Sequence, residues 1–393
     1  MMRIRLIIIV LSLSMGILPL TAAEADTSSK APSLLPVAGW QTRHSGVFCG
    51  SDFPSNQLLS AHARVGFRFS PETKMGALNP YAIQGIGVAV NTFFNGKEVG
   101  TPIAFYVFQS ARIAALTERV SLDYEWNFGL SGGWKPYDRQ TNPANTTVGS
   151  PWNAYINLGL YLNWDLNPGL TLQTGAVFSH FSNGNTRYPN SGVNAAGLSV
   201  GLLWDLQHAQ DPAAVRRAHE LADRSEPFRR HLTWDLVLYG AVRKKGIMIN
   251  DEDALLVPGS FGIAGLNINP LYHVNRHFAA GLSLDAQYDE SANIQDHIAG
   301  TNLYTKEIVF FRPPFKEQFS AGLSVRAELS MPIFSINAGI GRNFYCCGHD
   351  TDSFYQILAL KAHVSRHFFL HIGYQVFRFK NPNNLMLGIG ARF

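Results

Sequence analysis

Apolar and polar residues alternate along much of this chain. In residues 120–130 and 152–164, every second residue is apolar, and most residues between them are polar or small. A repeat of two is the repeat of a β-strand, whose side chains point alternately to opposite faces. Other segments with the same alternation are 278–288, 319–329, 368–376 and 385–393. The pattern predicts an all-β protein whose strands have one apolar and one polar face.

The strand lengths and the composition indicate a membrane barrel. Trp152 and Trp164 end one alternating segment and are twelve residues apart. A tilted strand of that length spans roughly 30 Å along the membrane normal, so the two rings match two interfacial aromatic girdles. The chain has 46% hydrophobic residues but, after its first residues, no apolar run long enough to span as a helix. We expect an antiparallel transmembrane β-barrel of about 12–14 strands.

The connections between the strands are of two kinds. Short turns occur at 117–119, 167–169, 275–276 and 365–366, and long polar connections occur at 134–150, 244–258, 289–317 and 345–353. Outer-membrane barrels have short periplasmic turns and long extracellular loops. We count about fifteen strands, whereas single-chain bacterial barrels have an even number. Either 59–70 or 103–116 is miscounted, or the first strand lies outside the wall.

The same reasoning divides the chain into segments. Residues 1–23 are typical of a signal peptide, with Arg3 and Arg5, an apolar run to Leu20 and a small-residue cleavage site. We expect residues 24–57 to be an N-terminal periplasmic segment and residues 58–393 to form one outer-membrane barrel without a second domain. Within it, 211–224 is predicted as a periplasmic helix, with Asp211 as N-cap and Pro212 at its first position. The alternating C-terminus, with Phe393 last, resembles the assembly signal of outer-membrane barrels of Gram-negative bacteria.

Three polar residues interrupt an otherwise apolar strand face. His180 and Ser182 continue the apolar positions of residues 170–178, and Asn194 precedes the apolar positions of residues 196–204. A hairpin between these two strands brings the three side chains together on the outside of the barrel. The strand that starts after the turn at 167–169 runs outward, so we expect the three residues at its extracellular end, facing the outer leaflet.

The residues around this hairpin resemble a known family. His180-Phe181-Ser182-Asn183-Gly184, followed by Pro189-Asn190-Ser191-Gly192-Val193-Asn194, is similar to the signature of the lipid A deacylases of PagL type, also called acyloxyacyl hydrolases. Members are outer-membrane barrels that remove an acyl chain from lipopolysaccharide. The resemblance implies Ser182 as nucleophile, His180 as base, and the position of Asn194 as the residue that orients the histidine.

The chain departs from the family at the orienting position, where a glutamate is expected and Asn194 stands. A carboxylate fixes the imidazole tautomer and stabilises the imidazolium. In a serine-protease triad, changing the acid to its amide lowers the rate by about four orders of magnitude. An asparagine carbonyl still accepts a hydrogen bond from the ring, as in Cys-His-Asn proteases. The resemblance therefore implies an ester hydrolase with a weakened triad.

Further site residues follow from the same resemblance. Asn183 and Asn190 match family asparagines, and their amides are suited to stabilising an oxyanion. Arg187 lies between the paired strands, where it can reach a phosphate of lipid A. The resemblance implies no metal and no cofactor. The expected partners are lipopolysaccharide and outer-membrane lipid, and both a monomer and a homodimer stay open.

Two other functions stay open at this stage. A passive outer-membrane channel would use the polar strand faces as a water-filled lumen, and a catalytically inactive homologue would bind lipopolysaccharide without cleaving it. The formal charge of +4 is too small to indicate nucleic-acid binding. Cys49, Cys346 and Cys347 have no zinc spacing and receive no role from the sequence.

Overall fold

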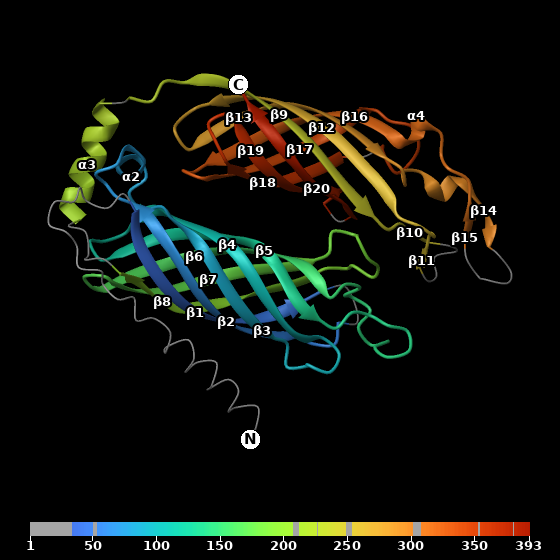
Figure 1. Cartoon of the computed structure of the whole chain (residues 1–393), viewed down its shortest axis with the longest axis horizontal. Coiled ribbons are helices and arrows are strands. Elements are labelled where there is room, and N and C mark those ends of the chain that lie inside the picture. Colours follow the sequence, from blue (N-terminus) through green and yellow to red (C-terminus); the bar gives the residue numbers. More distant parts are fainter. Residues whose placement is uncertain are drawn as a thin grey trace.

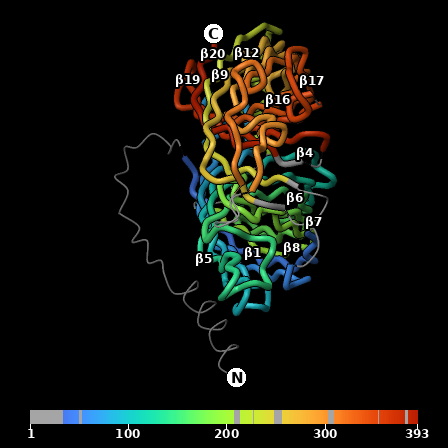
Figure 2. The backbone as a smooth tube through the Cα atoms, turned by 90° about the vertical axis from the view of Figure 1, so that its right-hand side faces the viewer, coloured from blue at the N-terminus to red at the C-terminus, as the bar shows by residue number. Residues whose placement is uncertain are grey.

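The protein contains two closed antiparallel barrels, each built from eight strands of the described residues. The computed structural model describes residues 34–49, 53–206, 212–225, 227–248, 254–301, 308–352, 354–379 and 381–393. The predicted signal peptide at 1–23 and the predicted cap Asp211 lie outside these ranges. Figures 1 and 2 show the barrels side by side, with their long loops at the same end.

The first barrel runs from residue 34 to residue 205, and β8 pairs with β1 to close it. Its strands are β1 (Leu34–Phe48), β2 (Gln57–Phe69), β3 (Ile83–Thr92), β4 (Gly100–Ala115), β5 (Val120–Trp134), β6 (Trp152–Asn167), β7 (Leu170–Ser182) and β8 (Val193–Asp205).

The second barrel runs from residue 231 to residue 392, and β20 pairs with β9 to close it. Its strands are β9 (His231–Arg243), β12 (Phe261–His273), β13 (Phe278–Asp289), β16 (Phe319–Ser330), β17 (Phe334–Tyr345), β18 (Phe354–His363), β19 (Phe368–Phe377) and β20 (Asn381–Arg392). Its loops carry the short elements β10 (Gly246–Met248), β11 (Ala254–Leu256), η1 (Ile294–His297), β14 (Ile298–Thr301), β15 (Ile308–Phe310) and α4 (Phe315–Gln318).

The predicted class, an all-β antiparallel barrel with short turns and long loops, is confirmed, but the prediction of one barrel of about 12–14 strands over residues 58–393 is wrong. The chain forms two smaller barrels, and a second domain is present. Every strand has the same repeat of two, so the alternation does not say which strands pair. The first barrel closes because β8 pairs with β1 instead of continuing to β9.

The missing strand of the odd count is β1, which the sequence analysis placed in a periplasmic segment at 24–57. The expected segment is wrong because residues 34–48 lie in the barrel wall. Its lumen side carries the buried polar side chains Gln41, Arg43 and Ser45, so the strand does not read as apolar. The segments 59–70 and 103–116 are both real strands, within β2 and β4.

Paired polar side chains fill the lumen of the first barrel. The guanidinium of Arg43 donates to the hydroxyl of Tyr155 at 3.0 Å. Arg64 donates to the carboxylate of Glu125 and to the amide oxygen of Gln173. All five side chains are buried. An eight-stranded barrel is narrow enough for side chains to fill its interior, and here two buried arginines share the carboxylate of Glu125.

The second barrel has its own charged cluster. The ammonium of Lys361 lies 2.6 Å from Asp235 Oδ2 and also donates to Glu328. Arg392 binds Asp235 with two hydrogen bonds of 2.7 Å and donates to Glu328 at 2.6 Å. Two cations therefore face two carboxylates, which balances charge in a region where an unpaired ion is costly.

The barrels also touch through their outer faces. Trp126 of β5 lies on the apolar outer face, yet only 4% of its surface is exposed. Its ring packs edge-on against Phe334 of β17, with centroids 5.0 Å apart, and its indole N–H donates to Gln109 of β4. Part of the wall that alternation predicts to face lipid is therefore covered by the other barrel.

The connection between the barrels lies at the short-turn end, which is periplasmic in outer-membrane barrels. The predicted helix at 211–224 is confirmed as α3 (Pro212–Ser225). It packs against α2 (Lys74–Leu78), and the ring of His219 hydrogen bonds to the carbonyl of Ala77 at 2.7 Å. Within the described ranges, no helix is both long and apolar enough to cross a membrane.

Candidate functional site

The register of β7 and β8 brings the three expected residues to one place. His180 of β7 pairs directly with Asn194 of β8, and Ser182 ends β7 two residues later. Residues two apart on a strand share a face. The intervening Phe181 is buried on the opposite side, in the lumen. The three polar side chains therefore lie on the outer face, at the end of β7 that leads into the loop 183–192.

The three side chains form a continuous hydrogen-bonded line. Asn194 Oδ1 lies 2.7 Å from His180 Nδ1, and His180 Nε2 lies 3.0 Å from Ser182 Oγ. The contact expected between Asn194 and the histidine is thus present, on the ring nitrogen opposite to the serine. When Asn194 accepts through its oxygen, Nδ1 carries the proton and Nε2 is left to accept the serine proton. Ser182 is 9% exposed.

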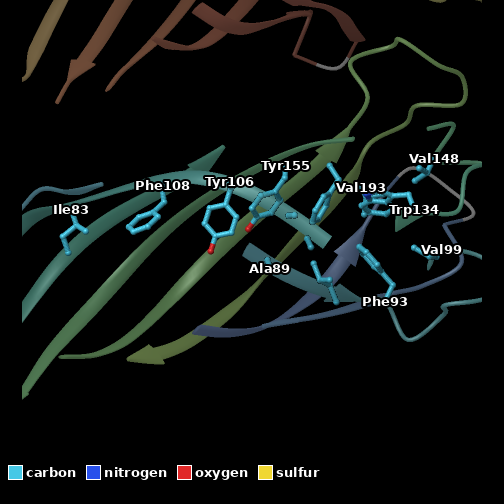
Figure 3. Close-up of a cluster of buried hydrophobic side chains, with 14 of the residues drawn as sticks. Ile83, Ala89, Phe93, Val99, Tyr106, Phe108, Trp134, Val148, Tyr155 and Val193 are labelled. Atoms are coloured by element: carbon cyan, nitrogen blue, oxygen red, sulfur yellow. The ribbon is translucent and has the colours of Figure 1, made fainter. Parts of the chain in front are cut away.

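An aromatic cluster fixes the strand from behind. Phe181 packs against Trp134 and Tyr155, with ring centroids 5.1 Å and 5.2 Å away. Figure 3 shows Tyr155 beside Tyr106 within this cluster, with Trp134 and Phe93 toward the loops. Interior side chains this closely packed resist displacement. Because Phe181 stands between His180 and Ser182, its anchoring also fixes the backbone that carries them.

The loop after Ser182 is held by its asparagines. The backbone N–H of Asn183 donates to Asn190 Oδ1 at 2.9 Å, and Asn190 Nδ2 donates to Asn185 Oδ1 at 3.0 Å. Asn183 Oδ1 accepts from the backbone N–H of Arg187 at 3.3 Å. Asn183 Nδ2 is buried and has no hydrogen-bond partner among the described residues. Asn183 directly follows Ser182 in the chain, and a buried donor without a partner is suited to stabilising a negative charge.

Two glycines of the loop shape the site, although the sequence analysis gave them no role. Gly192 has φ +74°, and a Cβ atom there would lie 2.9 Å from His180 Cε1. Gly184 has φ +63°, and a Cβ atom there would lie 3.3 Å from Leu385 of the second barrel. The dipeptides Asn-Gly and Ser-Gly are the sequence signal for these two positions, because glycine readily adopts a left-handed backbone in turns.

Arg187 lies apart from the line of His180, Ser182 and Asn194. Its side chain is exposed and lines a cavity between the loop 183–192 and the second barrel. A single barrel, as predicted from the sequence, has no second rim that could form the far wall of that cavity.

Cys49 follows β1 and lies beside the site. It is half-buried and approaches the backbone of Asn194. Burial raises the pKa of its thiol to about 11, although the hydrogen bond with Asn194 acts in the opposite direction. A thiol with such a pKa stays protonated at neutral pH and is a poor nucleophile.

Two family models match the chain. A family model described as lipid A 3-O-deacylase (PagL) matches residues 109–202, which include the three site residues. A model described as the C-terminal domain of acyloxyacyl hydrolase matches residues 232–393, which are the second barrel. The two models together span more than half of the chain.

Two solved structures are similar to parts of the chain. The crystal structure of Neisserial surface protein A (NspA) is 9% identical, with 45% of this chain and 100% of that chain covered and a TM-score of 0.32. The crystal structure of the outer membrane enzyme PagL is 12% identical, with 42% and 97% covered and a TM-score of 0.28. A search of curated proteins found no match.

Proposed function

Because the chain belongs to the lipid A deacylase family of PagL type, we propose that it cleaves an acyl ester of lipid A in the Gram-negative outer membrane, with Ser182 as nucleophile. The observation that carries this proposal is the line from Asn194 through His180 to Ser182. A hydroxyl is a weak nucleophile until a base beside it takes its proton, and His180 Nε2 is at the right distance to do so.

The reaction proceeds in two steps. Ser182 Oγ attacks the ester carbonyl carbon while its proton passes to His180 Nε2, and the ester oxygen then leaves with that proton as the sugar hydroxyl. Water, activated by the same ring nitrogen, attacks the acyl-serine and releases the fatty acid. His180 and Ser182 return to their starting protonation states, so atoms and protons balance.

Asn194 orients the ring but gives less help than a carboxylate. Its oxygen accepts from Nδ1–H and so favours the tautomer that leaves Nε2 free. It adds no negative charge to stabilise the imidazolium that forms when Ser182 loses its proton. Its amide also has a donor end, which in a rotated side chain would favour the wrong tautomer. We therefore propose a slow deacylase.

We assign the oxyanion to Asn183. Asn183 directly follows Ser182 in the chain, its Nδ2 is buried without a partner among the described residues, and a preorganised donor that meets the developing charge lowers the barrier. Asn190 acts indirectly, since its Oδ1 holds the backbone N–H of Asn183 and so fixes the residue that donates.

The site faces the bilayer and not the lumen, so acyl chains reach it from within the outer leaflet. The same placement argues against a passive channel, as do the charged side chains that fill both lumens. The inactive, lipopolysaccharide-binding alternative is favoured by one observation, the amide at position 194.

Mass spectrometry of lipid A separates these functions. Lipid A from Gram-negative cells that express the protein should lose one acyl chain, and the loss should vanish with Ser182→Ala. Ser191→Ala is the matched control, because Ser191 is an exposed serine of the same loop. Unchanged lipid A with a correctly folded wild-type protein would reject the deacylase and leave the binding protein.

A further inference from the structure

A cavity of about 510 Å³ lies between the two barrels, beside the proposed catalytic site. The first barrel contributes Asn185, Arg187 and Tyr188 from the loop 183–192. The remaining wall comes from the rim of the second barrel, including the start of the β9–β12 loop and the loop between β19 and β20. We call this cavity the interbarrel pocket. In Figure 1, β10, which lines it, lies at the loop end of the second barrel.

The pocket is strongly cationic. Five of its lining residues are lysine or arginine and two are aspartate, and the cations are Arg187, Arg243, Lys244, Lys245 and Arg378. Arg243 pairs with Asp289 at 2.9 Å, and Lys245 pairs with Asp350 at 2.5 Å. These two pairs use both aspartates, so three positive charges are left in excess.

The three excess cations have no carboxylate partner within the described part of the chain. The ammonium of Lys244 donates to the carbonyl of Gly259, and Arg378 donates to the carbonyl of Asp352 at 3.5 Å. A backbone carbonyl satisfies a donor but does not neutralise its charge. Arg187 is exposed and comes from the opposite wall. Cations from both barrels thus converge on one hollow, which favours an anion with several acceptor oxygens.

Hydrogen bonds connect the pocket wall to the nucleophile. The backbone N–H of Lys244 donates to the carbonyl of Asn185 at 2.8 Å, and Asn185 Nδ2 donates to the carbonyl of Asn383 at 3.4 Å. Asn185 in turn accepts from Asn190, which holds the residue next to Ser182. The second barrel therefore supports the loop that follows Ser182. Asn185, which lines the pocket, lies three residues after the reacting serine in the chain.

We propose that the interbarrel pocket binds a phosphate group on the sugar headgroup of the substrate lipid, and that the second barrel is thus a substrate-binding domain. This inference rests on the proposed deacylase function for the identity of the lipid. The pocket holds the phosphorylated sugar at the rim while the acyl ester reaches Ser182 on the outer face. Arg187, Lys244 and Arg378 are the residues that provide the binding charge.

A binding measurement without turnover tests this assignment. The full chain carrying Ser182→Ala is purified in detergent micelles, and its affinity is measured for lipid A and for lipid A from which the phosphates have been removed. We expect the phosphorylated lipid to bind at least about tenfold more tightly, a factor that one charge-assisted hydrogen bond can supply. Inorganic phosphate is added as a competitor, to separate a free-phosphate site from a lipid-headgroup site.

The variant Arg187→Gln/Lys244→Gln/Arg378→Gln should remove the preference and bind both lipids equally. The matched control Lys97→Gln/Arg139→Gln/Lys316→Gln removes three charges from exposed residues that lie between strands and do not line the pocket. It should keep the preference. A shift in gel mobility on heating checks that each variant has folded.

Several results would overturn the inference. One is equal affinity of the parent protein for both lipids, and another is a preference that survives in the pocket variant. A third is full competition by inorganic phosphate at concentrations similar to that of the lipid, which would identify a free-phosphate site. Failure of the proposed function looks different: the headgroup preference would persist while the wild-type protein leaves lipid A intact.

Discussion

The two barrels have the same architecture but differ at one pair of strands. In the first barrel, the seventh strand, β7, ends with His180 and Ser182 on its outer face. In the second barrel, the seventh strand, β19, has Tyr374 and Val376 at the outer positions near its loop end. Both walls otherwise have buried lumen residues alternating with more exposed outer ones. The proposed chemistry therefore requires only a few polar residues at one rim of a barrel wall that has the usual alternation of faces.

The largest expected effect is a difference in hydrolysis rate between variants of His180 in β7 and His371 in β19. His180→Ala removes the proposed base, and we expect hydrolysis of lipid A to fall by about three orders of magnitude or more. His371→Ala in β19 removes a buried lumen histidine of the second barrel and should leave the rate within a few-fold of wild type. Rates on purified lipid A in micelles measure both. Equal losses would mean that His180 matters only for folding.

A second prediction concerns stability and the second barrel alone. Lys361→Met leaves Asp235 and Glu328 buried with only Arg392 to compensate them. Removing one partner of a buried charge cluster costs about 3–5 kcal/mol. We expect a lower midpoint in heat- or urea-induced unfolding, followed by gel mobility. Lys97→Met, at an exposed loop residue, is the control and should leave the midpoint unchanged.

The orienting residue gives a smaller and more specific effect. Asn194→Glu supplies the carboxylate that the amide lacks, and we expect the rate to rise at least about tenfold, within the limit of about four orders of magnitude known for such a change. Asn194→Leu removes the acceptor at His180 Nδ1 and should lower the rate below wild type. Steady-state kinetics on the three proteins measure this order. Identical rates for Glu, Asn and Leu would make Asn194 a bystander.

The smallest effect compares two glycines with left-handed backbone, one in each barrel. Gly192→Ala places a methyl group against His180 Cε1, and we expect the rate to fall by about tenfold as the ring is displaced. Gly259→Ala has similar backbone strain, with φ +102°, but a Cβ atom there meets nothing within 4 Å. It should reduce stability slightly and leave the rate unchanged. A similar rate loss in both would indicate a general effect of backbone strain.

Much of the local structure could be predicted from the sequence. The alternation in β5, β6 and β7 predicted both the strands and the face on which His180 and Ser182 lie. In the structure, a hairpin with a ten-residue loop sets Asn194 opposite His180, and a slip of one residue would turn the apolar face of one strand to the lumen. That register brings His180 and Asn194 close enough for the hydrogen bond between their side chains.

The arrangement of whole barrels could not be predicted in the same way. The pairing of β8 with β1 joins strands about 150 residues apart, and nothing in a repeat of two distinguishes that partner from β9. Trp126 looked lipid-facing because a side chain that contacts another barrel has the same apolar character as one that contacts lipid. The interbarrel pocket could not be predicted either, because its cations come from two barrels and from segments far apart in the chain.

The closure of each barrel by its own first and last strands has a consequence for how such a chain arises. An even number of strands returns the polypeptide to the side of the membrane from which it entered, so β1 begins and β8 ends on one side, as do β9 and β20. One complete barrel can therefore be joined to another by a link on that side, such as the segment around α3, without changing the strand order of either barrel. Gene duplication or fusion can add a domain in this way while the older one keeps its topology. A catalytic unit can thus acquire a neighbour that contributes recognition alone.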